Sequence, residues 1–237
     1  MDAHADLPPD TLTPLLAAEL APLFWRPSRA GVESAWIAHV PFAHWIVPAL
    51  RPRLVVELGT HNGVSYCAFC DAVAAARLDA RCYAVDTWEG DEHAGFYGQL
   101  VYDDLRRFND QRFGAFSELL RCTFDAALDY VAGGSVDLLH IDGCHSYDAV
   151  RHDFESWRPK LSDRAVVLFH DTNVRERGFG IWRYFAELRM DYPGFEFLHE
   201  HGLGVLAVGR AVPAPVAASV CVRSMGMCEV ILPRPQV

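Results

Sequence analysis

Two histidines and an aspartate lie at the end of an apolar run in the segment VDLLHIDGCHSYDAVRHDFESW, residues 136–157. The run is typical of a buried strand, it leads into His140, Asp142 and His145, and a helical pattern begins directly afterwards. Ionisable groups at the exit of a buried strand cost free energy unless a partner or a ligand uses them. A histidine there can accept a hydroxyl proton near neutral pH, and a carboxylate can hold a cation. The segment therefore predicts acid–base or metal-assisted chemistry.

Acidic residues also lie at the ends of three other strand-like runs. The runs are RLVVEL (53–58), RCYAVD (81–86) and AVVLFHD (165–171), and the acidic residues are Glu57, Asp86 and Asp171. Because all four runs are rich in Val, Leu and Ile, they are typical of strands buried on both faces, which are parallel. The carboxyl ends of parallel strands meet along one edge of a sheet, where ligands bind. The sequence therefore predicts that these three residues and Asp142 form one rim.

The segments between these runs must position that rim. Amphipathic helical patterns occupy residues 63–78, 97–111, 124–133, 147–161 and 180–192. Residues 117–122 are a further strand candidate, and the two apolar runs of 195–209 that meet near Gly202 are typical of an antiparallel hairpin. The expected fold class is α/β, with a Rossmann-like, doubly wound, mostly parallel sheet of seven strands and an antiparallel C-terminal hairpin.

Three regions are expected along the chain. Residues 1–50 form a helical leader, with helical patterns over 11–24 and 34–50 and a break or kink near Pro41. Residues 51–209 form the domain that contains the sheet. Residues 210–237 form a Pro/Ala-rich tail of uncertain order.

The first strand-to-helix turn, VVELGTHNGVS, contains a carboxylate and two glycines. Gly59 and Gly63 permit positive φ and let a ligand approach the backbone closely. The turn differs from the G-x-G-x-x-G dinucleotide fingerprint, which has a third closely spaced glycine. Glu57 before this turn suits a ligand that carries positive charge, and Asp86 at the end of the second strand can accept both hydroxyls of a ribose.

Four segments together resemble a known family. VVELGTHNGVS, YAVDTWEGDEHAGFYG, VDLLHIDGCHSYDAVRHDFESW and AVVLFHDT are similar to class I S-adenosylmethionine-dependent methyltransferases, and most closely to a bacterial subgroup with an H-I-D-G-x-H-x-Y motif. Some members of that subgroup methylate sugars or antibiotic precursors. The resemblance covers roughly residues 30–209, so residues 51–209 are expected to bind S-adenosylmethionine.

The resemblance implies a set of cofactor contacts. The turn after the first strand holds the methionine part and approaches the sulfonium, Asp86 accepts the ribose hydroxyls, and residues 117–123 lie near the adenine. The implied cofactor-binding residues are Glu57, Gly59, Thr60, Gly63, Ser65, Asp86, Thr87, Trp88 and Asp142. The polar, glycine-rich segment 89–98 is either a lid over the acceptor or a solvated loop.

Two chemical routes remain open at the acceptor. In one, Asp142 and Asp171 hold a divalent cation, with magnesium as the first candidate and Thr172 at the place where relatives carry a third ligand. Thr172 or Asn173 could supply a neutral oxygen, and His170 or His145 a nitrogen if the metal were softer. In the other, no metal is present, and His145 is the general base with an aspartate orienting it. Asp142 and His145 are the catalytic residues that we predict, whereas His140 is expected to be packed and hydrogen-bonded.

The predicted function is S-adenosylmethionine-dependent methylation of a hydroxyl on a small molecule, a sugar or a glycan or natural-product precursor. The alternatives are an NAD(P)-dependent oxidoreductase on a similar sheet and a non-catalytic cofactor-binding protein. The formal net charge of −10 argues against a nucleic-acid partner, and no apolar run reaches the roughly 18 residues of a membrane span. Seven scattered cysteines indicate reduced thiols, and therefore the cytoplasm. A homo-oligomer is left open.

Overall fold

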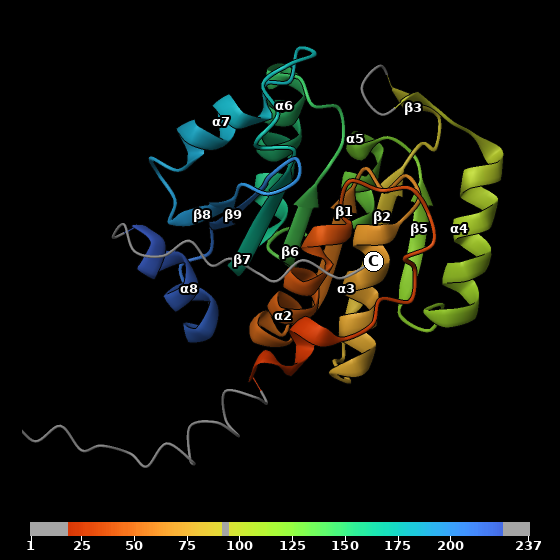
Figure 1. The fold of residues 1–237 in the computed structure, drawn as a ribbon, viewed down its shortest axis with the longest axis horizontal. Helices are drawn as coiled ribbons and strands as arrows, with labels where there is room; N and C mark the ends of the chain where they lie inside the picture. The colour runs from red at the N-terminus through yellow and green to blue at the C-terminus, as the bar shows by residue number, and fades with distance from the viewer. Residues whose placement is uncertain (1–18, 92–94, 225–237) are drawn as a thin grey trace, which may run out of the picture.

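A computed structural model describes residues 19–91 and 95–224 of the chain (Figure 1). Its main sheet has seven strands in the order β5-β2-β1-β6-β7-β9-β8. The strands are β1 (Leu54–Leu58), β2 (Arg81–Asp86), β5 (Ser117–Arg121), β6 (Val136–Ile141), β7 (Leu161–His170), β8 (Gly194–Phe197) and β9 (Leu203–Ala207). The first five are parallel, and β9 lies antiparallel between β7 and β8. The predicted fold class, including the C-terminal hairpin, is confirmed.

Helices cover both faces of this sheet. One face carries α2 (Val40–Leu50), α3 (Val64–Ala75), α4 (Gln99–Arg112) and α8 (Ala214–Ser224), and the other carries α5 (Phe124–Ala127), α6 (Tyr147–Trp157) and α7 (Ile181–Leu188). Successive strand residues alternate between the two cores, so that Val55 packs with α2 and α3 whereas Val56 packs with α6 and α7. Burial on both faces explains why the strands are continuous apolar runs.

Short elements connect these layers. A small ribbon of β3 (Gly90–Asp91) and β4 (Gly95–Phe96) lies in the segment that was predicted to be either a lid or a loop. The 3-10 turns are η1 (Ala21–Phe24), η2 (Ile37–His39), η3 (Leu128–Tyr130) and η4 (Arg158–Lys160). No helix among the described residues is both long and apolar enough to cross a membrane.

The leader and the tail differ in part from what the sequence predicted. The helical pattern of 34–50 is broken just before Pro41, as predicted: η2 ends at His39 and α2 begins at Val40, so Pro41 lies in the first turn of α2, where the N–H that proline lacks has no helical partner anyway. The helix predicted over 11–24 falls mostly outside the described residues, which include only its end and η1. In the tail, α8 contacts β8 and β9, and residues 225–237 lie outside the described part.

Strand register brings the acidic residues to two different levels. Leu58 of β1 pairs with Val85 of β2 and with Ile141 of β6. One residue further along each strand, Gly59, Asp86 and Asp142 therefore meet at the same edge. Glu57 lies below that edge, level with Ala84 and paired directly with His140.

Candidate active site

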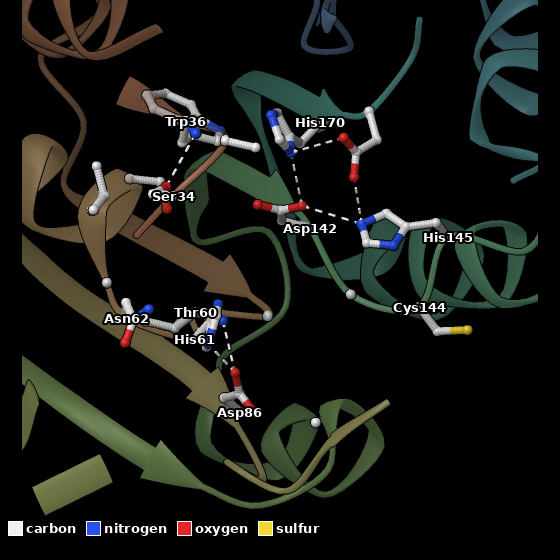
Figure 2. Close-up of a pocket in the computed structure, with 18 of the residues that line it drawn as sticks. Ser34, Trp36, Thr60, His61, Asn62, Asp86, Asp142, Cys144, His145 and His170 are labelled. Carbon is white, nitrogen blue, oxygen red and sulfur yellow. Dashed lines mark hydrogen bonds and ion pairs between the residues drawn. The ribbon is translucent and has the colours of Figure 1, made fainter. Parts of the chain in front are cut away.

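A cavity of about 430 Å³ opens at the carboxyl ends of β1, β2, β6 and β7. This is the crevice in which open α/β sheets bind ligands. Figure 2 shows Asp86 beside the turn at Thr60–Asn62 in one part of the pocket and the Asp142–His145–His170 group in another. Nine predicted site residues line the cavity: Gly59, Thr60, Gly63, Ser65, Asp86, Thr87, Asp142, His145 and Asp171. Three others, Glu57, Trp88 and Thr172, are fully buried and do not line it.

Asp86 holds the glycine turn in place. Its Oδ2 accepts hydrogen bonds from the backbone N–H groups of Thr60 and His61, both at 2.9 Å, and its Oδ1 accepts one from Trp88 N at 2.7 Å. The hydroxyl of Tyr97 donates to Oδ2 at 3.2 Å. A carboxylate oxygen has two lone pairs, so Oδ1 can accept another donor, as a ribose contact requires. Asp86 is therefore a structural support of the turn as well as a candidate ligand.

The turn also needs glycine at Gly59. This residue has φ +85°, and a Cβ on it would collide with the backbone carbonyl of Asp142. Gly59 N donates to Val85 O at 2.9 Å, and Asp142 N donates to Leu58 O at 2.8 Å. The backbones at the carboxyl ends of β1, β2 and β6 are thus hydrogen-bonded to one another, and they leave no room for a side chain at position 59.

A buried chain of hydrogen bonds runs from β1 to the leader. Trp36 Nε1 donates to His140 Nε2 at 3.1 Å, and His140 Nδ1 lies 2.7 Å from Glu57 Oε2. Because an indole N–H only donates, His140 Nε2 is the acceptor, and the proton of the neutral ring is on Nδ1, donated to Glu57. The expectation that His140 is packed and hydrogen-bonded is confirmed. Trp36 lines the cavity as well, so this chain sets one of its walls.

Glu57 has one oxygen without a partner. Burial raises the pKa of this carboxyl, and the hydrogen bond from His140 opposes the rise. The Ser65 hydroxyl also lowers the pKa, yet no hydrogen bond of normal geometry reaches Oε1 from the described residues. A buried, orphaned carboxylate oxygen beside a pocket is a candidate partner for a cationic ligand.

We expect Glu57→Gln to weaken S-adenosylmethionine binding by roughly 10- to 100-fold, since hydrogen bonds to charged groups contribute about 1.5–3 kcal/mol. Glutamine keeps an oxygen for His140 but removes the charge. Calorimetry with S-adenosylmethionine and with S-adenosylhomocysteine measures the effect. A loss confined to the first ligand identifies the sulfonium as the group that Glu57 recognises. Glu155→Gln, on the exposed face of α6 and outside the cavity, is the matched control, because glutamine there also keeps an oxygen for its hydrogen-bond partner, Tyr184. Equal affinities of Glu57→Gln and wild type would leave Glu57 with a structural role only.

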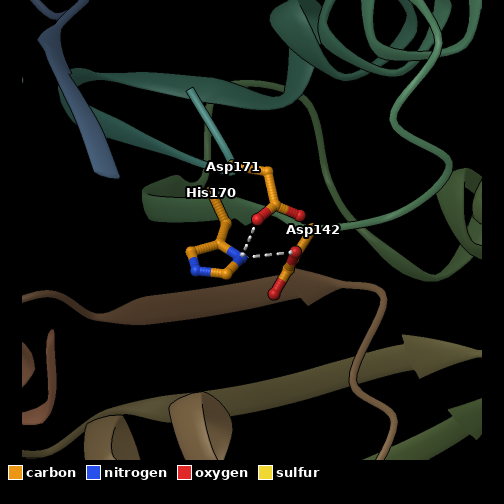
Figure 3. A group of neighbouring side chains, drawn as sticks. All are labelled: Asp142, His170 and Asp171. Carbon is orange, nitrogen blue, oxygen red and sulfur yellow. Dashed lines mark hydrogen bonds and ion pairs between the residues drawn. The ribbon is translucent and has the colours of Figure 1, made fainter. Parts of the chain in front are cut away.

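The second part of the pocket contains two carboxylates surrounded by imidazoles. Asp142 Oδ1 lies 3.1 Å from His170 Nδ1 and 3.4 Å from His145 Nε2. Asp171 Oδ2 lies 2.8 Å from His145 Nε2, while Asp171 Oδ1 lies 3.0 Å from His201 Nδ1 and 3.5 Å from His170 Nδ1. Figure 3 shows the inner three side chains, Asp142, His170 and Asp171, turned toward one another.

These contacts set the charges of the group. Burial alone would raise the pKa of Asp142, but the charge of His170 and the hydrogen bonds from His145 and His170 lower it well below its usual range. Burial alone would lower the pKa of His145, but its hydrogen bonds to Asp142 and Asp171 raise it to about 10. At neutral pH and with no cation present, His145 is therefore protonated and cannot accept a proton. The prediction of a near-neutral His145 is wrong for this arrangement.

Several residues that reach the cavity were not predicted. His201 comes from the turn between β8 and β9, Glu33 and Ser34 come from the leader, and Phe179 stacks on His145 with ring centroids 4.6 Å apart. Tyr97, in the segment 89–98, packs its ring 4.2 Å from that of His61. The pair of histidines in LHEHG (198–202) was the one visible sequence signal among these residues.

Comparisons with known proteins show what this chain is similar to. Residues 56–172 match a family model described as a methyltransferase domain. Over these residues the chain is similar to a methyltransferase domain. The uncharacterized protein y4gI of Sinorhizobium fredii is 56% identical to it over 185 residues, which are 78% of this chain and 20% of that protein. The chain thus spans about one fifth of the length of this curated relative.

Solved structures share the architecture of this chain. A candidate caffeoyl-CoA O-methyltransferase from Staphylococcus aureus matches with a TM-score of 0.57 and 12% identity over 84% of this chain and 92% of its own. The S-adenosylhomocysteine-bound methyltransferase PaMTH1 from Podospora anserina matches with a TM-score of 0.53 and 13% identity over 87% of this chain and 98% of its own. A methyltransferase from Geobacter sulfurreducens matches with a TM-score of 0.53 and 15% identity over 85% of this chain and 90% of its own. At these identities the likeness shows the fold alone.

The family match over residues 56–172 agrees with the predicted class, a class I S-adenosylmethionine-dependent methyltransferase, and the solved structures confirm the predicted fold. The bacterial subgroup with the H-I-D-G-x-H-x-Y motif stays a prediction.

Proposed function

We propose that this chain is an S-adenosylmethionine-dependent O-methyltransferase that acts on a hydroxyl of a small molecule. The observation that carries the proposal is the pairing, in one cavity, of the Asp86-supported glycine turn with the Asp142–Asp171 carboxylates. The turn lets the cofactor approach the backbone closely, and Asp86 can accept hydrogen bonds from its ribose. The carboxylates lie in the part of the cavity where we place the hydroxyl that receives the methyl group and must lose its proton. S-adenosylmethionine supplies an activated methyl group when bound.

The residues of the chain bind and orient in this proposal. Asp86 fixes the turn and accepts from the ribose, and the carboxyl of Glu57, buried below the rim, attracts the cationic end of the cofactor through its charge. Transfer of a methyl group is an in-line displacement, so holding the acceptor oxygen in line with the methyl carbon is the main requirement. The aromatic face of Phe179 and the polar groups of Glu33 and Asn62 line the cavity, and they suit a polyhydroxylated acceptor.

A divalent cation fits the carboxylate pair. Asp142, His170 and Asp171 each offer a ligand atom, and these atoms lie within 4.8 Å of one another. Two carboxylates that close repel unless positive charge lies between them; without a cation the protonated His145 supplies that charge, and a bound cation would supply it instead. A cation there favours loss of a hydroxyl proton, which methyl transfer to oxygen requires. The metal-free route through His145 is weaker, because both aspartates already hold that ring in its protonated form.

The sugar or natural-product acceptor rests on the resemblance of the segment 136–157 and on the polar lining of the cavity. The cytoplasmic setting and a homo-oligomeric state remain predictions. Because one structural neighbour is named for caffeoyl-CoA, phenolic acceptors belong in the screen beside monosaccharides and nucleotide sugars. Transfer of label from S-adenosylmethionine to a phenol but not to any sugar would reject the sugar assignment and keep the reaction class.

Cofactor binding is the first test of the function. We expect S-adenosylmethionine and S-adenosylhomocysteine to raise the melting temperature, and NAD and NADP to leave it unchanged, since only a ligand of the folded state stabilises it. Asp86→Ala should weaken S-adenosylhomocysteine binding at least tenfold, because about 1.5–3 kcal/mol of hydrogen bonding to a charged acceptor is lost. It should also lower the melting temperature, because the Thr60 and His61 N–H groups lose their acceptor.

Asp110→Ala, on the exposed face of α4, is the control and should change neither quantity. Stabilisation by NAD rather than by S-adenosylmethionine would favour the oxidoreductase alternative. Binding of S-adenosylmethionine without label transfer to any acceptor would leave the non-catalytic alternative.

A further inference from the structure

We propose that the cation at this site is a first-row transition ion, bound through His170 Nδ1 together with Asp142 and Asp171, and that it is preferred over magnesium. The inference rests on the proposed function only in that it names the ion of the same site. Among the predicted ligands, it selects His170 in place of Thr172. The Thr172 side chain is fully buried, does not line the cavity, and has no hydrogen-bond partner for Oγ1 among the described residues.

The spacing of the three ligand atoms fits a single ion. His170 Nδ1 lies 3.1 Å from Asp142 Oδ1 and 3.5 Å from Asp171 Oδ1. Nitrogen and oxygen ligands lie about 2.0–2.2 Å from such a metal, so neighbouring ligand atoms at octahedral or tetrahedral angles are roughly 3.0–3.5 Å apart. The His170 nitrogen is thus already at ligand spacing from an oxygen of each carboxylate, and all three ligand atoms lie within 4.8 Å of one another.

The ligand atoms, two carboxylate oxygens and one imidazole nitrogen, decide which ion the site prefers. Magnesium binds oxygen almost exclusively and keeps several waters, whereas an imidazole nitrogen suits zinc, iron, cobalt and nickel. The His170 side chain is 4% exposed and is held between the two carboxylates, so it cannot swing away to leave a site of oxygens alone. A magnesium ion would have to share this space with an unused imidazole.

The neighbours of the group support it as a metal centre. His145 and His201 contact the two oxygens of Asp171 at 2.8 and 3.0 Å, which fixes the carboxylate as hydrogen bonds fix the ligands of metal sites. His39 packs edge-on against His170, with ring centroids 5.7 Å apart, and limits rotation of that ring. All three ligand residues line the cavity, so further coordination positions face the bound acceptor.

Metal binding to the chelator-stripped full chain tests the inference without any activity. We expect calorimetry to show one cobalt(II) or zinc(II) ion per chain bound at least 100-fold more tightly than magnesium. Cobalt(II) should also give visible absorption bands typical of mixed nitrogen and oxygen ligation. His170→Asn should weaken cobalt binding at least tenfold, and His170→Asp, which supplies a third carboxylate, should shift the preference toward magnesium.

His152→Asn, an exposed histidine on α6, is the control and should bind cobalt like wild type. Circular dichroism establishes that each variant is folded. Equal affinity for cobalt and magnesium, or wild-type cobalt affinity in both His170 variants, would overturn the inference. S-adenosylhomocysteine binding, measured on the same stripped protein, distinguishes the two proposals. If the stripped wild-type protein does not bind S-adenosylhomocysteine, the cofactor assignment is rejected, and the metal result is unaffected.

Discussion

Asp171→Asn is expected to lower the rate of methyl transfer by about 10²–10⁴-fold, the range that proton transfer by a positioned group contributes to catalysis. The substitution removes the charge that faces His145, His170 and His201, and so removes one of the two carboxylates of the proposed cation site. S-adenosylhomocysteine affinity should remain within about threefold of wild type, because the Asp86 turn lies in another part of the pocket. The measurement is turnover of labelled cofactor with the acceptor found in the screen.

The control for this variant lies on the same strand. Asp163→Asn alters an exposed aspartate near the start of β7, remote from the carboxyl end, and should retain full turnover. Wild-type enzyme should lose activity in a chelator and recover it when the ion is restored. Full turnover in the chelator together with a dead His145→Gln variant would instead identify the metal-free route.

Gly59→Ala is expected to destabilise the fold by about 2–6 kcal/mol and to abolish measurable cofactor binding. A residue other than glycine at φ +85° costs about 1–3 kcal/mol, and crowding in a packed region adds about 1–3 kcal/mol. The new methyl group would press on the Asp142 carbonyl and Gly143 N, and so would separate the exits of β1 and β6. For a chain of this size, the melting temperature should fall by roughly 5–20 °C.

Gly134→Ala isolates the effect of crowding. Gly134 also has a positive φ, +67°, but a Cβ there meets nothing within 4 Å. This variant should therefore show the backbone strain alone and bind S-adenosylhomocysteine like wild type. If chemical denaturation gave the two variants the same free energy of unfolding, the contact with Asp142 would not be what requires glycine at position 59.

The sequence was sufficient for the strands and for most of the rim. Strands buried on both faces are continuous apolar runs, so β1, β2, β6 and β7 could be located from residue type alone, whereas the partly exposed β5 was only a strand candidate. Asp86, Asp142 and Asp171 come directly after such runs or end them, and parallel strands bring their carboxyl ends to one edge. The expectation that they line one cavity needed no knowledge of the loops, and it holds.

Register decided the place of Glu57. In the sequence it looks like the other acidic strand ends, but one residue, Leu58, still follows it in β1. Its direct pairing with His140 on β6 puts it below the rim, where a hydrogen bond satisfies one oxygen. No pattern within a single strand specifies which residue of a neighbouring strand lies opposite.

Composition and local pattern thus determined the α/β class, the sheet and the residues available for chemistry in this protein. The tertiary structure alone decided which of them act together, since His201 arrives from the β8–β9 turn and Trp36 from the leader. It also decided their charge: His145 looks in sequence like a neutral base, yet two aspartates from different strand ends raise its pKa to about 10. The physical reason is that electrostatic and hydrogen-bond energies depend on distances through space, which separation along the chain does not encode.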